Sequence, residues 1–196
     1  MKKILIASHN EGKIKEFRDI LEPLGLEVVS AAELNVSDVE ETGKTFEENA
    51  ALKAEAMTRE TGFACIADDS GLCVNALSGR PGVYSARYAP DRDFGKGMDM
   101  ILEEIAATGS EDRSAYFMCV LALAVPGGEV YTFEGKVDGN ISLEKRGDRG
   151  FGYDKIFVPK GYDLTFGELS KEEKNALSHR GRALQKFVEF MKTKNG

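Results

Sequence analysis

SAYFMCVLALAVPGGEVYTFEGKV (residues 114–137) contains two long apolar runs on either side of a Pro-Gly-Gly sequence. Runs rich in Val, Leu, Phe and Tyr that flank such turn residues are typical of a β-hairpin. We therefore expect an antiparallel pair of strands over residues 114–125 and 129–137. The continuous apolar part, residues 117–125, is too short to span a bilayer, so the hairpin is expected to belong to a sheet inside a folded domain.

Upstream of this hairpin, the pattern alternates between strand and helix. Residues 3–7 (KILIA) form a short strand-like run, and apolar residues between Ile14 and Leu24 recur at helical spacing. A second helix is expected from Thr45, which forms a capping-box pattern with Glu48, to about residue 60. Strands that can pair in parallel, combined with a hairpin and helices, predict an α/β fold with helices covering a mixed sheet.

Residues 63–67 (FACIA) are expected to form a strand that ends at Asp68 and Asp69, followed by a second short strand over 72–74. Asp is a common turn residue, but two adjacent carboxylates repel each other wherever water is scarce. The pair is therefore either a solvated turn or a site that holds something positive.

The remaining helices are expected around residues 101–105, with a stop at Gly109, and from Ser170 to the C-terminus. Ser170 and Glu173 match a second capping box. Gly181 is costly inside a helix, so we expect a break or a close contact there. The last turns carry an apolar stripe made of Leu184, Phe187, Val188 and Met191.

From the sequence we expect one acidic, globular domain covering residues 1–196. The chain has 196 residues, 42% of them hydrophobic and 30% charged, with a net charge of −7 and a pI near 5.1. These values argue against a general binder of nucleic acids or membrane surfaces. The N-terminal apolar run is too short for a signal peptide. The three cysteines lack the spacing of zinc ligands, so we expect them to be buried, reduced thiols. We expect a cytoplasmic protein.

SHNEGKIKE (residues 8–16) links the first strand to the first helix. Backbone N–H groups at a helix N-terminus favour anions, and Lys13 adds a positive charge beside them. The stretch is not a P-loop, because the earlier Gly and the Ser or Thr after the Lys are missing. Phosphate binding and a plain solvated turn are both open on spacing alone.

EETGKTFEENA (residues 40–50) supplies a further carboxylate. Glu47 and Glu48 complement the helix dipole, whereas Glu41 lies in a loop that could approach Asp68 and Asp69. Carboxylates from two segments, with phosphate oxygens opposite, would suit Mg²⁺, which keeps few protein ligands.

Two further stretches could contact a nucleoside. GFGYD (residues 150–154) contains Phe151 and Tyr153, either of which could stack on a base, although such turns are also ordinary loops. KNALSHRGR (residues 174–182) concentrates basic groups in an acidic chain and could donate hydrogen bonds to an anion or a carbonyl, or be a solvated helix face.

Taken together, these stretches resemble the inosine triphosphate pyrophosphatase family. The resemblance covers essentially the whole chain through SHNEGK, EETGKTFEENAALKA, IADDSGL, LSGRPGVYSARY, GFGYD and SKEEKNALSHRGRAL. It implies hydrolysis of ITP, dITP and XTP to the monophosphate and pyrophosphate with Mg²⁺. It also implies a homodimer whose subunits have an elongated mixed sheet and two lobes around a substrate cleft.

By motif position, the resemblance also implies roles for individual residues. Glu41 and Asp69 would serve the metal, and Asp69 would accept the proton of the attacking water, with Lys13 as its catalytic partner. The phosphates would be held by Ser8, His9, Asn10, Glu11, Gly12 and Lys13. The remaining substrate contacts would come from Ser70, Phe151, Gly152, Tyr153, Asp154, Lys174, His179 and Arg180.

The chain departs from the family pattern at two positions. His9 stands where a Gly is usual, so its imidazole is expected to add a phosphate donor, and Lys155 stands where a Pro is usual after GFGYD. Two other functions stay open. A phosphatase with an aspartyl nucleophile needs Asp-x-Asp, which Asp68-Asp69-Ser70 lacks, and a nucleotide sensor would need neither Glu41 nor Asp69.

Overall fold

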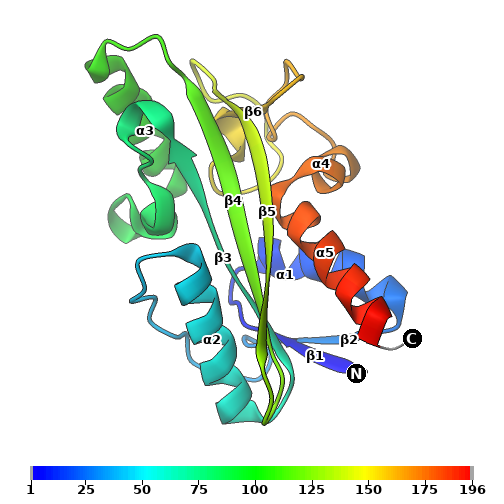
Figure 1. Ribbon diagram of the computed structural model, residues 1–196. Helices are drawn as coiled ribbons and strands as arrows, with labels where there is room; N and C mark the ends of the chain where they lie inside the picture. The colour runs from blue at the N-terminus through cyan, green and yellow to red at the C-terminus, as the bar shows by residue number, and fades with distance from the viewer. Residues whose placement is uncertain (1, 195–196) are drawn as a thin grey trace. The chain divides into compact units, whose positions relative to one another are not determined.

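The computed structural model describes residues 2–194 as a six-stranded mixed sheet with helices (Figure 1). The strand order is β2-β1-β3-β4-β5-β6. β1 pairs in parallel with β2 and β3, whereas β5 pairs antiparallel with β6. The predicted α/β class with a mixed sheet is therefore confirmed.

The strands are β1 (Lys3–Ile6), β2 (Glu27–Ser30), β3 (Cys65–Val74), β4 (Ser114–Ala124), β5 (Val130–Ile141) and β6 (Phe157–Pro159). The α-helices are α1 (Glu11–Leu21), α2 (Phe46–Thr61), α3 (Phe94–Thr108), α4 (Lys171–Leu177) and α5 (His179–Lys194). Short 3₁₀ helices occupy Glu22–Leu24, Asn75–Leu77, Gly82–Arg87, Pro90–Arg92 and Asp154–Ile156. No helix within residues 2–194 is both long and apolar enough to cross a membrane.

Local sequence signals account for most helix ends. The Thr45 side chain accepts a hydrogen bond from Glu48 N at the start of α2, and Ser170 and Glu173 form a complete capping box at α4. Gly62 and Gly109 end α2 and α3 in the left-handed conformation, which a residue without a Cβ adopts at little cost.

The expected final helix is divided in two. α4 ends at Ser178, whose φ/ψ is extended, and α5 begins at the next residue. A Cβ on Gly181 would lie 2.1 Å from the carbonyl oxygen of Asn175. The predicted close contact at Gly181 is therefore present, while the break lies three residues earlier.

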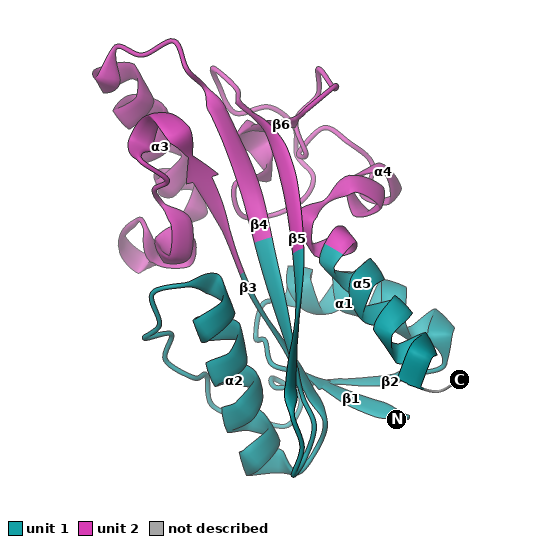
Figure 2. Cartoon of the chain, viewed as in Figure 1, with its two compact units in different colours: residues 1–69, 119–134, 183–196 teal, residues 70–118, 135–182 magenta. Residues whose placement is uncertain are grey.

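The chain forms two compact units (Figure 2). Unit 1 comprises residues 1–69, 119–134 and 183–196, and unit 2 comprises residues 70–118 and 135–182. The boundary crosses β3, β4, β5 and α5, so each unit contains part of these elements.

Each unit has its own apolar core. In unit 1, α1 and α5 pack Phe17, Leu184 and Phe187 against β1, β3 and β4, while α2 lies on the other face of this part of the sheet (Figure 1). Residues 119–124 of β4 are all buried, as expected for a strand covered on both faces. In unit 2, α3 packs Ile101 and Ile105 with Phe157 and Phe166. Cys65, Cys73 and Cys119 are buried thiols, as predicted.

Candidate active site

Asp68 and Asp69 lie in the middle of one continuous strand, not in a turn. β3 runs unbroken from Cys65 to Val74, and both aspartates are buried. The predicted strand end and second short strand are therefore wrong. β1 pairs with β3 at Cys65 and Ile66, and β4 is the neighbour of β3 on its other side, so pairing with β4 continues the strand where a turn was expected. The buried carboxylates must then be compensated by other groups.

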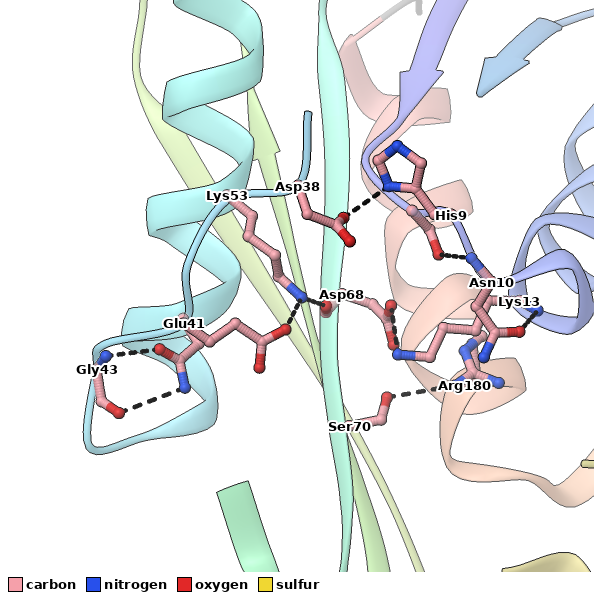
Figure 3. Close-up of polar contacts among 12 residues, drawn as sticks. His9, Asn10, Lys13, Asp38, Glu41, Gly43, Lys53, Asp68, Ser70 and Arg180 are labelled. Atoms are coloured by element: carbon pink, nitrogen blue, oxygen red, sulfur yellow. Dashed lines mark hydrogen bonds and ion pairs between the residues drawn. The ribbon is translucent and has the colours of Figure 1, made fainter. Parts of the chain in front are cut away.

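Lys13 provides the first compensating charge. Its Nζ lies 3.2 Å from Asp68 Oδ1, and only 2% of the Asp68 side chain is exposed (Figure 3). The ion pair compensates the buried carboxylate and fixes the position of the ammonium group in turn. Asp68 thus holds Lys13 beside the N-terminus of α1.

The turn before α1 is ordered by its own side chains. Ser8 Oγ accepts a hydrogen bond from Asn10 N, and Asn10 Oδ1 caps the helix by accepting one from Lys13 N. Glu11 is the exposed first residue of the helix, followed by the half-buried Gly12. Uncapped N–H groups at such a helix end, together with Lys13, suit an anion.

Glu41 lies next to the two aspartates, although it precedes them by more than 25 residues. Lys53 Nζ donates a hydrogen bond to Glu41 Oε1 over 2.9 Å and another to the main-chain oxygen of Asp68 (Figure 3). Burial alone lowers the pKa of Lys53, but the charges of Asp68, Glu41 and Asp69 outweigh it and raise that pKa. Lys53 is therefore a firmly protonated cation among three carboxylates.

Asp69 is the least compensated of the three. Burial and then repulsion by Glu41 raise its pKa to about 7, against the opposing effects of Lys53 and of a hydrogen bond from Asn49. Among the described residues, its buried Oδ2 has no hydrogen-bond partner. A carboxyl group with this pKa can take up and release a proton near neutral pH.

Asn49 connects Asp69 to the segment that carries Glu41. It is fully buried at the start of α2, accepts a hydrogen bond from Gly43 N at 2.7 Å and donates one to Gly43 O. A Cβ on Gly43 would lie 2.7 Å from Asn49 Oδ1, so this contact requires glycine.

His9 is directed toward the same segment. Its Nδ1 lies 2.6 Å from Asp38 Oδ1 (Figure 3). Its Nε2 lies 2.7 Å from the carbonyl oxygen of Val36. Both ring nitrogens therefore contact protein groups in this structure.

In unit 2, Asp154 and Lys174 form a buried ion pair. The Lys174 Nζ lies 2.7 Å from Asp154 Oδ2, which also accepts a hydrogen bond from Phe151 N. Lys174 Nζ lies 4.5 Å from the centre of the Phe151 ring, and Arg180 Cζ lies 5.5 Å from it. The pair fixes the turn of Phe151 and places Lys174 at its ring, where Arg180 supplies a second cation.

The other predicted residues of unit 2 have distinct surroundings. Tyr153 is buried in the core and donates its hydroxyl to Ser85 O, so of the two aromatic residues Phe151 is the better candidate for stacking. The buried His179 ring stacks on Phe117 with centroids 4.7 Å apart. Arg180 donates to Ser70 Oγ over 3.4 Å (Figure 3), and Gly152 has a left-handed φ of 62°.

Lys53 and Asn49 were missed in the sequence. Lys53 interrupts the buried face that Ala50, Ala54 and Met57 form on α2, and a lysine in an apolar stripe is a usable signal. Asn49 had no such signal, because a polar residue in a first helical turn is ordinary.

These features define an α/β protein that places carboxylates and ammonium groups beside the N-terminus of a helix. The chain belongs to the Ham1 family, whose model matches residues 4–190, and this confirms the resemblance inferred from the motifs.

Curated relatives and solved structures agree with that membership. The chain is 50% identical to a Bacillus subtilis protein named dITP/XTP pyrophosphatase, over 97% of this chain and 98% of that one. An Agrobacterium fabrum protein of the same name is also 50% identical, over 95% and 94%. A solved HAM1 protein from Coxiella burnetii superimposes with a TM-score of 0.91 at 40% identity, covering 98% of this chain and 100% of that one.

Proposed function

We propose that this chain is a nucleoside-triphosphate pyrophosphatase that removes non-standard purine nucleotides (ITP, dITP and XTP). Hydrolysis would yield the nucleoside monophosphate and pyrophosphate. The observation that carries the proposal is the meeting of Glu41, Lys53, Asp68 and Asp69 in unit 1, with Lys13 held at the start of α1. The names of the relatives support the same activity.

We propose Mg²⁺ as the cofactor, with Glu41 and Asp69 as the residues that would hold it. The buried Asp69 Oδ2 without a hydrogen-bond partner among the described residues, and the raised pKa of this group, show a carboxylate short of positive charge. Within residues 2–194, no three His, Cys, Asp or Glu side chains are grouped so that they could hold a metal ion by themselves. Mg²⁺ typically takes one or two carboxylates and completes its shell with phosphates and waters. When bound, it would neutralise phosphate charge.

In the proposed reaction, a water oxygen forms a bond to the α-phosphorus while the bond to the bridging oxygen of the β-phosphate breaks. Asp69 accepts the proton of the water as general base. Lys13 and the N–H groups at the start of α1 stabilise the negative charge on the departing pyrophosphate. No covalent intermediate with the chain is needed.

For the nucleoside, we propose that unit 2 supplies the contacts. Phe151 would stack on the base, and His179 and Arg180 would donate hydrogen bonds to the oxygen at the six position of hypoxanthine or xanthine. Adenine carries an amino group there, which would leave buried donors facing a donor and would disfavour ATP strongly. Steady-state rates with ITP, XTP, ATP and GTP test this idea, and equal efficiency with ATP would end it.

Product analysis is the decisive experiment. Incubation of the chain with dITP should release pyrophosphate with Mg²⁺ present and none with EDTA. Asp69→Asn should abolish turnover while nucleotide binding, measured by calorimetry, survives. Orthophosphate as the direct product would point to a phosphatase, and binding without hydrolysis under any divalent metal would point to a sensor.

We further propose a cytoplasmic homodimer. The family resemblance supports it, and so do large apolar side chains that are exposed in unit 2, among them Tyr84, Leu143 and Tyr162. Light scattering of the purified chain tests the stoichiometry, and a monomer at micromolar concentration would refute the dimer.

A further inference from the structure

The segment that carries Glu41 has little regular backbone structure. Residues 36–43 form no helix or strand, and side chains from elsewhere contact this segment at both ends. Asn49 holds its far end at Gly43, and Lys53 contacts Glu41 itself.

His9 holds the near end of the same segment. Val36 is buried and bonded through its N–H to Ala31 O, and its carbonyl oxygen accepts from His9 Nε2. Two residues later, Asp38 meets His9 Nδ1. The imidazole thus contacts two points of the segment at once, although it is 27 residues away in sequence from the nearer one.

The two partners of the His9 ring are of the same kind. A backbone carbonyl and a carboxylate both accept hydrogen bonds, so each ring nitrogen of His9 lies against an acceptor of this segment. A ring that makes both bonds has no nitrogen left for a phosphate oxygen. This differs from the role of phosphate donor that the sequence predicts for His9.

We propose that His9 is a positioning residue that ties the phosphate-binding turn, Ser8–Lys13, to the segment carrying Glu41. Through Val36 and Asp38 it keeps the carboxylate of Glu41 at a fixed place relative to that turn. The inference rests on the proposed function for the roles of the turn and of Glu41, but the contact itself does not.

Hydrogen exchange of the metal-free and nucleotide-free chain tests the contact directly. His9→Ala and Asp38→Ala should each speed exchange of the two amides that are hydrogen-bonded at the ends of this segment, Val36 N to Ala31 O and Gly43 N to Asn49 Oδ1. We expect about three- to tenfold, the loss expected for one or two partly exposed polar contacts. The double variant should exchange little faster than His9→Ala, because both changes remove the same tie. Glu40→Gln removes a charge from the same segment at an exposed position and should leave exchange unchanged.

The dependence of turnover on Mg²⁺ tests the consequence. His9→Ala should raise the half-saturating Mg²⁺ concentration about two- to fivefold, while the KM for dITP at saturating Mg²⁺ stays within about twofold of the parent value. Asp38→Ala should behave in the same way. If His9 instead donated a hydrogen bond to a phosphate, the effects would be reversed: His9→Ala would raise the KM for dITP, and Asp38→Ala would leave that KM unchanged.

Unchanged exchange in His9→Ala, or additive effects of the two substitutions, would overturn the inference. So would a raised KM with an unaltered Mg²⁺ requirement. If the parent chain fails to hydrolyse dITP, the proposed function falls while the exchange experiment still decides whether His9 holds the segment.

Discussion

Lys53 Nζ and Glu41 Oε1 lie 2.9 Å apart and join α2 to the segment before it. The same ammonium donates to the main chain of β3 at Asp68. One lysine therefore links three separate parts of unit 1 at the point where their carboxylates meet. Its removal would leave buried negative charge without compensation.

Lys53→Met tests this compensation. We expect the metal-free variant to lose roughly 2 kcal/mol of its free energy of unfolding at pH 8, since breaking a largely buried ion pair leaves the partner charge unpaired. Turnover should fall at least about tenfold, because Glu41 loses its contact. Urea unfolding and pyrophosphate release measure the two effects. Arg59→Met, an exposed change on the same helix, serves as the control, and equal stability of the two variants would contradict the prediction.

The raised pKa of Asp69 predicts a pH-dependent stability of the metal-free chain. The folded state keeps the Asp69 proton up to about pH 7, whereas the unfolded chain releases it near the ordinary value of 3.8. The folded state therefore binds more protons between these values, and this group makes stability fall as pH rises from about 4 to about 7.

Asp69→Asn removes that penalty, since the amide can still accept from Asn49. In EDTA at pH 8, we expect the variant to be more stable than the parent by on the order of 2 kcal/mol, with the gain vanishing near pH 4. Thermal unfolding across this range measures it. A variant less stable than the parent at pH 8 would show that burial does not penalise the Asp69 charge.

Gly43→Ala should disturb the Glu41 segment by steric conflict. The added Cβ would lie 2.7 Å from Asn49 Oδ1 and 2.8 Å from Glu48 Cβ, which forces one of the partners to move. We expect a loss of about 1–3 kcal/mol in stability and a matching rise in the Mg²⁺ requirement. In Gly128→Ala the new Cβ would have nothing nearer than 3.5 Å, so this variant should match the parent in both measurements.

Lys174→Met should weaken unit 2 at the Phe151 turn. Only 7% of the Lys174 side chain and 5% of the Asp154 side chain are exposed, so the substitution leaves a buried carboxylate unpaired. We expect roughly 3 kcal/mol of destabilisation and a raised KM for dITP. Urea titration and steady-state kinetics measure the two quantities, with the exposed Lys160→Met as the control. A KM unchanged from the parent would separate this pair from nucleoside binding.

Local patterns in the sequence determined the elements whose signals lie within a few residues. The capping residues Thr45 and Ser170, the stop at Gly109 and the hairpin around Pro126 all appear where they were expected, because such signals act over one turn of backbone. The ordered motifs were likewise sufficient to identify the family.

Only the tertiary structure decided what Asp68 and Asp69 do. Their residue type favours a turn, but pairing with β4 extends β3 through them, and two lysines from different helices supply the charge that makes their burial possible. The contacts of Glu41 with Lys53 and of His9 with Asp38 likewise join residues 12 and 29 positions apart. Such pairings depend on how separate elements pack. Local propensities act over a few residues, so they carry no information about contacts between residues this far apart in the sequence.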